Sequence, residues 1–254
     1  MNNTIRYPAV AGSFYPAKAA QLRRQVQGFL DDSKITAGTP KAIIVPHAGY
    51  IYSGVVAASA YSHINAAAIR RVVLLGPSHR VRFRGVAASS AQVWRTPLGD
   101  VPIEACELPS LDVAHQQEHS LEVQLPFLQM VLAQFVLLPL VVGDADKESV
   151  AALLQTLWGG NDTLVVVSAD LSHYQNYAVA TDMDSRTSQA IVSLDSDVIQ
   201  PDDTCGRIPV RGLLHLARTK RMSARLLDLR NSGDTAGDRD QVVGYGAYAF
   251  YDDQ

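Results

Sequence analysis

The chain has 254 residues, 47% of them hydrophobic, so it can bury a sizeable core and is not expected to be disordered. Its net charge of −3 argues against a nucleic-acid partner, and no apolar run reaches the roughly 18 residues of a membrane span. Two cysteines make no disulfide framework, and the first residues show no basic segment followed by an apolar one, so we expect a cytoplasmic protein without a secretory signal.

Four short runs of apolar, largely β-branched residues predict strands that are buried on both faces. They show no alternation of polar and apolar residues, which is typical of a parallel sheet covered by helices on both sides. The runs cover residues 41–46, 70–76, 135–143 and 162–168.

Helical patterns lie between and after these strands, and their alternation predicts βαβ units with right-handed crossovers. They cover residues 54–64, 120–132, 147–158, 183–194 and 207–219. Near the C-terminus, residues 223–232 and 242–251 are expected to pair as strands across a loop rich in Gly and Asp. The predicted fold class is therefore α/β: a single domain over residues 1–254 with a central mixed, mostly parallel sheet flanked by helices.

Polar side chains follow each of the four predicted strands. These residues are His47, His79, Asp144 and Asp170. In open α/β sheets, ligands bind beyond the carboxyl ends of the strands. Because His47 and His79 lie about one βαβ unit apart, we expect neighbouring strands to bring both imidazoles to one metal ion, at the ~2.0–2.1 Å of a zinc–nitrogen bond. Either histidine taken alone is equally consistent with a helix cap or a polar loop.

Cys205 lies in the polar stretch "DDTCGRIPV", directly before the predicted helix 207–219. A helix N-terminus stabilises a thiolate, which is the form that binds metal. Asp202 and Asp203 argue against deep burial, so we interpret Cys205 as a third metal ligand; a buried structural cysteine is the alternative. Cys106 has no comparable surroundings and is interpreted as structural.

Two further clusters supply candidate acid–base residues. Glu118 precedes His119, and Glu122 is expected one helical turn later on the same face as His119. We assign His119 an acid–base or supporting role rather than metal ligation; the alternative is that these carboxylates only match the helix dipole. Asp170 and His173 form a second pair, since a carboxylate beside a histidine can fix its tautomer or tune a proton shuttle. The remaining histidines are interpreted as structural: His63, His115 and His215.

Six motifs, in this order along the chain, resemble the Memo family, whose bacterial members are also called AmmeMemoRadiSam system protein B. They are "YPAVAGSFYP", "VPHAGYIYSG", "LLGPSH", "EHSLEVQLPFL", "SADLSHY" and "CGRIPV". The resemblance implies a fold similar to the class III extradiol dioxygenases, which are non-haem iron enzymes. It also implies a pocket lined by two histidines and a cysteine, which by motif are His47, His79 and Cys205. His119, Asp170 and His173 match further pocket motifs of the family.

The resemblance further implies iron or copper binding, a redox role and phosphotyrosine-peptide binding in eukaryotic relatives, and an association with a radical SAM protein in bacteria. Three functions stay open. The first is a metal-dependent, dioxygenase-like oxidoreductase with iron(II), or alternatively copper or zinc, and a small-molecule or peptide ligand in the pocket. The second is a hydrolase with Cys205 as nucleophile and His79, His119 or His173 as base, oriented by Asp170.

The third function is a non-catalytic peptide- or phosphopeptide-binding module with a vestigial pocket. Arginine is the side chain best suited to a phosphate group, and Arg80, Arg82 and Arg84 alternate directly after His79. The same alternation is also typical of a solvated edge strand.

Overall fold

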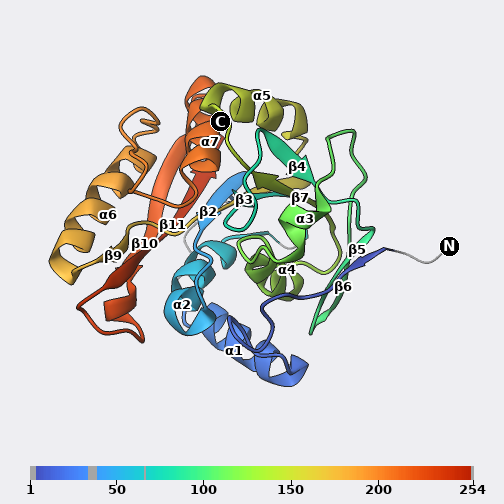
Figure 1. Cartoon of the computed structure of the whole chain (residues 1–254), viewed down its shortest axis with the longest axis horizontal. Helices are drawn as coiled ribbons and strands as arrows, with labels where there is room; N and C mark the ends of the chain where they lie inside the picture. Colours follow the sequence, from blue (N-terminus) through green and yellow to red (C-terminus); the bar gives the residue numbers. More distant parts are fainter. Residues whose placement is uncertain (1–3, 34–38, 66, 253–254) are drawn as a thin grey trace.

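The computed structural model describes residues 4–33, 39–65 and 67–252. At its centre is an eight-stranded sheet with the order β10-β11-β2-β8-β3-β7-β4, in which β9 pairs with β11 outside this path (Figure 1). The strands β2, β8, β3 and β7 are parallel to one another, while β4, β10 and β11 run antiparallel to their neighbours. The strand bounds are β2 (Ala42–Val45), β3 (Arg71–Pro77), β4 (Val86–Ala88), β7 (Val136–Val142), β8 (Thr163–Ser168), β9 (His173–Gln175), β10 (Ser223–Asn231) and β11 (Val242–Tyr251).

Helices cover both faces of this sheet, which explains why its central strands lack polar residues. Along β8, Leu164 and Val166 pack into one hydrophobic cluster, while Val165 and Val167 pack into the other. The helices α1 (Ala19–Asp31), α2 (Tyr50–Tyr61) and α4 (Leu125–Val131) belong to the first face. The helices α5 (Lys147–Leu157), α6 (Tyr177–Val192) and α7 (Arg207–Thr219) belong to the second; Figure 1 shows α1 and α2 at the bottom and α5 and α7 at the top. The predicted fold class, a mixed and mostly parallel sheet flanked by helices, is confirmed.

The predicted elements are present with shifted ends. The four apolar runs form β2, β3, β7 and β8, and β10 pairs with β11 as expected. The helix predicted at 183–194 already begins at Tyr177, because the side chain of Asn176 caps it by accepting from the Val179 N–H at 3.0 Å. The helix predicted at 120–132 is shorter: Glu122–Gln124 form a 3₁₀ turn, and α4 starts only at Leu125, followed by Pro126.

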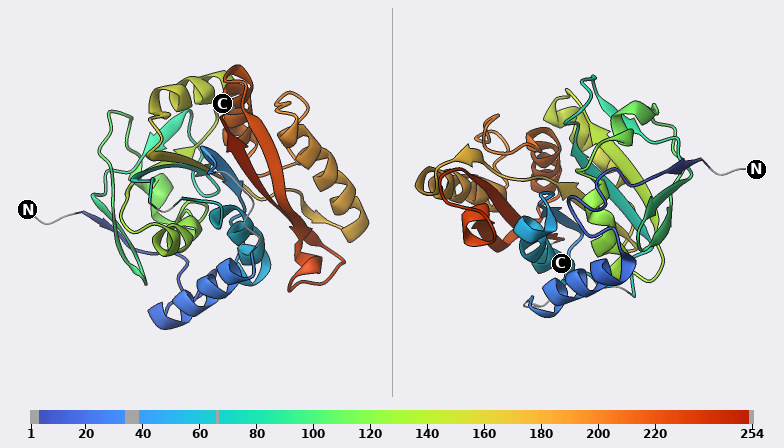
Figure 2. Two further views of the ribbon diagram at one scale, coloured as in Figure 1. Left: turned by 180° about the vertical axis from the view of Figure 1, so that it is seen from behind. Right: turned by 60° about the horizontal axis from the view of Figure 1, so that its bottom comes forward.

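The sequence pattern did not predict a small sheet of three strands in the order β1-β5-β6. It consists of β1 (Ile5–Arg6), β5 (Val93–Thr96) and β6 (Gly99–Pro102), and α3 (Asp112–Gln116) follows it in the chain. Seen from behind, this sheet and the long β10–β11 ribbon lie at opposite ends of the molecule (Figure 2). Within the described residues, no helix is both long and apolar enough to cross a membrane. That residues 1–254 form one domain stays a prediction.

The expectation that the strands before His47 and His79 are neighbours is wrong. Strand β8 lies between β2 and β3 and pairs in parallel with both. After β2 the chain therefore returns to the sheet as β3 two positions away, and the position between them is filled by β8. Since adjacent strands are ~4.8 Å apart, the two histidines start about 9–10 Å from each other. This gap gives two imidazoles room to point toward one another.

Candidate metal centre

Three strand ends deliver polar side chains to one cavity. His47 follows β2, Asp170 follows β8 and His79 follows β3, so these residues occupy consecutive positions along the edge of the sheet. With His119 and His173 they line a cavity of about 580 Å³, which we call the histidine cavity. The rest of its wall includes Phe14, Tyr52, Tyr174 and Tyr245. The prediction that polar side chains after the strands gather at one edge is therefore confirmed for three of the four strands; that they are functional stays a prediction.

Three imidazoles in this cavity meet closely enough to share a ligand. One nitrogen from each of His47, His79 and His119 lies within 4.8 Å of the others. The rings of His79 and His119 are stacked with centroids 4.7 Å apart, and the His47 ring stands at steep angles to both. Three nitrogens bound to one ion at ~2.0–2.1 Å are about 3.3–3.6 Å apart, so metal binding would draw the three rings together by up to about 1.5 Å.

A chain of buried hydrogen bonds fixes the tautomer of His47. The Gln124 amide N–H donates to the Pro46 carbonyl and to the Ser168 hydroxyl, at 2.9 and 2.8 Å. Ser168 uses its own proton to donate to the Ser120 carbonyl at 2.6 Å. The hydroxyl oxygen therefore accepts from His47 Nδ1, 2.9 Å away, and Nδ1 carries the proton. The Nε2 lone pair of His47 is left free for a metal ion.

The carboxylate of Glu118 fixes the tautomer of His79. It accepts from the backbone N–H and Nδ1–H of His79, at 2.6 and 2.8 Å, and from the N–H groups of His119 and Ser120, both at 2.9 Å. Burial opposes its ionisation, but the hydrogen bonds that it accepts outweigh that effect and lower the pKa of Glu118 to about 2. The ionised carboxylate holds the proton on Nδ1, so Nε2 of His79 is free to bind metal.

The other two imidazoles are held in their neutral form by burial. Burial, helped by the neighbouring histidines, places the pKa of His47 well below its usual value. Burial also lowers the pKa of His119 to about 4, although Glu118 acts in the opposite direction. A metal ion requires neutral imidazole. Nδ1 of His119 is buried and has no hydrogen-bond partner among the residues that the structure describes. The donor set therefore fits a transition metal.

Cys205 approaches His47 from outside the histidine cavity. Its Sγ lies 3.3 Å from His47 Nε2 and accepts from the Asp170 N–H at 3.4 Å. A sulfur at ~2.3 Å and a nitrogen at ~2.0–2.1 Å from one ion, at an angle of 90–110°, are about 3.1–3.6 Å apart, so this spacing fits two ligands of one metal. The expectation that the start of α7 favours the thiolate is wrong without metal, because burial and the Asp170 carboxylate raise the pKa of the thiol.

Asp170 and His173 both line the cavity, but they do not pair as expected. Asp170 accepts from the His47 N–H at 2.7 Å, and burial raises its pKa to about 6. His173 Nδ1–H donates to the Leu171 carbonyl at 2.8 Å, so Nε2 is the nitrogen that carries the lone pair in the neutral ring. The backbone carbonyl, rather than the carboxylate, thus sets the tautomer of His173.

Glu122 and Asp144 lie elsewhere. Glu122 turns away from His119, contrary to expectation, and binds Arg6, the hydroxyl of Tyr15 at 2.6 Å and two backbone N–H groups. His119 precedes the 3₁₀ turn and lies outside any helix, so the three-residue spacing does not bring Glu122 onto the same face. Asp144 follows β7, one strand beyond His79, and lines a different cavity.

The residues between His79 and β4 do not form a regular strand. Arg82 and Arg84 line the same cavity as Asp144, whereas Arg80 does not. The histidines interpreted as structural also lie outside the histidine cavity: His63, His115 and His215.

Comparison with known proteins agrees with the motif pattern. The Memo family model, described as Memo-like protein, matches residues 6–249. The chain belongs to the Memo family. MEMO1 family proteins of Aquifex aeolicus and Sulfolobus acidocaldarius are 37% and 35% identical to it. These alignments cover 95% and 98% of this chain, and 97% and 100% of the relatives.

The solved structure of the uncharacterized protein JW3007 from Escherichia coli K12 superposes with a TM-score of 0.43 at 10% identity, covering 82% of this chain and 99% of that one. A likeness at that level supports no conclusion.

Two residues that organise this Memo family site were not predicted, Gln124 and Ser168, and Glu118 was noted beside His119 but not as the partner of His79. Each is a buried polar residue within or beside an apolar pattern. Ser168 ends the strand "TLVVVS" on the same face as Leu164 and Val166, and Gln124 interrupts the apolar run "LEVQLPFL". A polar residue at a core position needs a buried partner, and this is the signal that could have identified them.

Proposed function

We propose that this Memo family protein is a metal-dependent redox protein that binds one transition-metal ion through His47, His79 and Cys205. The observation that carries the proposal is that His47 and His79 lie close together with their Nε2 lone pairs available. Ser168 and Glu118 each accept the Nδ1 proton of one of these histidines, which leaves Nε2 free. The sulfur of Cys205 lies at ligand spacing from one of them. Imidazole and thiolate favour iron(II), copper or zinc over hard cations, and we propose iron(II) first.

When bound, the metal would supply a redox centre with open coordination positions. The chain's own residues would handle protons around it. Nε2 of His173 can accept a proton inside the cavity, because Nδ1–H is occupied by the Leu171 carbonyl. Asp170, whose pKa burial raises to about 6 in the metal-free chain, accepts from the His47 N–H and lies at hand to exchange a proton. His119 is neutral, and its ring packs on Phe14, 4.8 Å between centroids.

The cavity itself supports a small ligand. Its volume of about 580 Å³ lies within the range of ~300–1,000 Å³ of small-molecule sites, and its wall combines aromatic rings with imidazole, carboxylate and hydroxyl groups. The substrate would therefore be a small molecule or a short peptide segment. An association with a radical SAM protein rests on the family resemblance.

A three-histidine ligand set is the second candidate, because His119 rather than Cys205 completes the group of nitrogens within 4.8 Å. Such a set is typical of zinc sites that activate water. A cysteine-dependent hydrolase has less support. The residue beside Cys205 is His47 rather than one of the proposed bases, and burial disfavours the thiolate.

The test is metal analysis of protein purified without oxygen and without a metal-affinity column. Wild type, Cys205→Ala and His119→Ala are compared, with Cys106→Ala as the matched control. We expect near-stoichiometric iron in the wild type, His119→Ala and the control, and a loss in Cys205→Ala. Metal retained in Cys205→Ala but lost in His119→Ala would establish the three-histidine set instead. If wild-type protein binds none of added Fe(II), Cu(I) and Zn(II), both ligand sets are excluded.

A further inference from the structure

A second cavity reaches Cys205 and shares no lining residue with the histidine cavity. It measures about 650 Å³ and lies between the loop after β3, the end of β7 and the first turn of α7. We call it the arginine cavity, after Arg82, Arg84 and Arg207 in its wall. Cys205 also lines it, and Pro77 and Ser78, which precede His79, form another part of its wall.

The positive charge of this cavity is not neutralised by the protein. No acceptor binds the guanidinium groups of Arg82, Arg84 or Arg207 within the part of the chain that the structure describes. The only acidic residue among the lining residues is Asp144. Three guanidinium groups against one carboxylate leave a local excess of positive charge in a chain whose net charge is −3. Such a concave cationic surface attracts anions.

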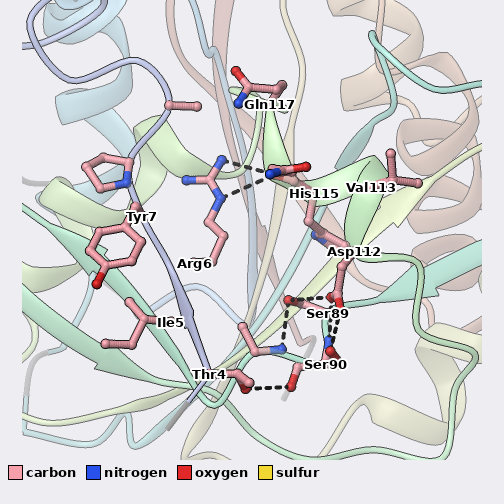
Figure 3. Close-up of a pocket in the computed structure, with 14 residues that line it drawn as sticks. Thr4, Ile5, Arg6, Tyr7, Ser89, Ser90, Asp112, Val113, His115 and Gln117 are labelled. Carbon is pink, nitrogen blue, oxygen red and sulfur yellow. Dashed lines mark hydrogen bonds between the residues drawn. The ribbon is translucent and has the colours of Figure 1, made fainter. Parts of the chain in front are cut away.

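In the cavity near the N-terminus, by contrast, the charged side chains are bound by other groups of the protein. Figure 3 shows Arg6 donating to the His115 carbonyl and the Asp112 carboxylate accepting from Ser89 and Ser90. Arg6 also pairs with the buried Glu122. The charged groups of that cavity already have partners, so it has no free charge for a ligand. The arginine cavity differs in this respect.

Local geometry favours an oxyanion in the arginine cavity. Arg82 and Arg84 are two residues apart in a segment without regular secondary structure, and both line the cavity. The third arginine, Arg207, opens the 13-residue helix α7, whose positive end faces the cavity with Ile208 and Pro209. Guanidinium forks bind the paired oxygens of carboxylate and phosphate groups in two-pronged fashion.

We infer that the arginine cavity binds the carboxylate or phosphate group of a small molecule, which then lies against Cys205. Cys205 lines this cavity and its Sγ is 3.3 Å from His47 Nε2, so a bound molecule would approach the proposed metal centre from the side away from the histidine cavity. The access to the metal rests on the proposed function; the anion site does not. The substrate or effector class is thus a small organic acid or phosphate ester.

The test is calorimetric titration of the full, metal-free chain at low ionic strength with two probes, inorganic phosphate and malonate. Wild type is compared with the Arg82→Gln/Arg84→Gln double variant. Arg225→Gln is the control, because Arg225 is exposed, packs over Tyr251 and lines neither cavity. We expect equal binding by wild type and control and at least about tenfold weaker binding by the double variant, since two charge-assisted contacts are lost. Tighter phosphate binding would indicate phosphate esters, and tighter malonate binding organic acids.

The location is tested on the same samples by iodoacetamide labelling followed by peptide mapping. The preferred anion should slow modification of Cys205 in wild type and control but not in the double variant, while Cys106 is unaffected. The inference is overturned if wild type and double variant bind both probes equally, or if wild type binds neither at millimolar concentration. A phosphotyrosine peptide whose binding neither probe displaces would also overturn it and assign the arginines to a protein partner. Because no metal is present, these results do not depend on whether the metal site is real.

Discussion

Replacing Glu118 with glutamine removes the negative charge from a fully buried carboxylate that accepts four hydrogen bonds, two of them from His79. These contacts lower the pKa of Glu118 from 4.5 to about 2, although burial alone would raise it. A shift of this size corresponds to about 3 kcal/mol in favour of the ionised form, at ~1.4 kcal/mol per pKa unit. Glutamine keeps the shape, but its amide N–H must face one of the donors. We therefore expect Glu118→Gln to lose about 3 kcal/mol of unfolding free energy at pH 7.

The sign of the pH dependence follows from the lowered pKa. The stability that Glu118 contributes is complete above pH 4.5 and is lost as the pH falls toward 2. The difference in unfolding free energy between wild type and Glu118→Gln should therefore stay constant from pH 8 to 5 and become smaller below pH 5. Urea unfolding of metal-free protein between pH 8 and 4 measures it, with the exposed Glu148→Gln as control. Metal affinity should also fall by about 10–100-fold, because His79 loses its partner. A loss of unfolding free energy below about 1 kcal/mol at pH 7 would refute the assigned role, because breaking a buried network of charge-assisted hydrogen bonds costs more than that.

Two other changes test neighbouring parts of the structure. Ser168→Ala leaves Nδ1–H of His47 and the Ser120 carbonyl without their shared partner, so we expect a stability loss of about 1–3 kcal/mol and ~10–100-fold weaker metal binding, measured by unfolding and metal competition. Unchanged metal affinity would contradict the tautomer assignment. Asp184 is buried with one oxygen unpartnered among the described residues, and burial raises its pKa from 3.8 to about 6. The wild type therefore loses stability as the pH rises through 6, and Asp184→Asn should be up to about 3 kcal/mol more stable at pH 8, with the gain gone at pH 4. A gain that does not depend on pH would show that the charge is not responsible.

The parallel core could be predicted because each central strand is apolar on both faces, which only a sheet covered on both sides requires. The same runs say nothing about which strand lies next to which. The placement of β8 between β2 and β3 was therefore missed, although the histidines that follow β2 and β3 were found. The edge at which polar residues gather depends only on strand direction, and this is why His47, His79 and Asp170 could be predicted to meet.

The supporting residues were harder to predict, because their roles arise from contacts between distant segments. Gln124, Ser168 and His47 come from three separate parts of the chain and become a unit only through folding. Glu122 was misplaced for a local reason, since His119 lies before the first helical turn and not within the helix that the apolar spacing predicted. The arginine cavity depends on Arg207, which no local pattern connects with Arg82 and Arg84.

The most direct test of the metal centre is X-ray absorption at the zinc edge of protein reconstituted with one equivalent of Zn(II). Ligation by His47, His79 and Cys205 predicts one sulfur at ~2.3 Å and imidazole nitrogens at ~2.0–2.1 Å, with the sulfur contribution absent in Cys205→Ala. A wild-type spectrum that shows only nitrogen and oxygen neighbours would contradict the account and leave the three histidines as the binding site.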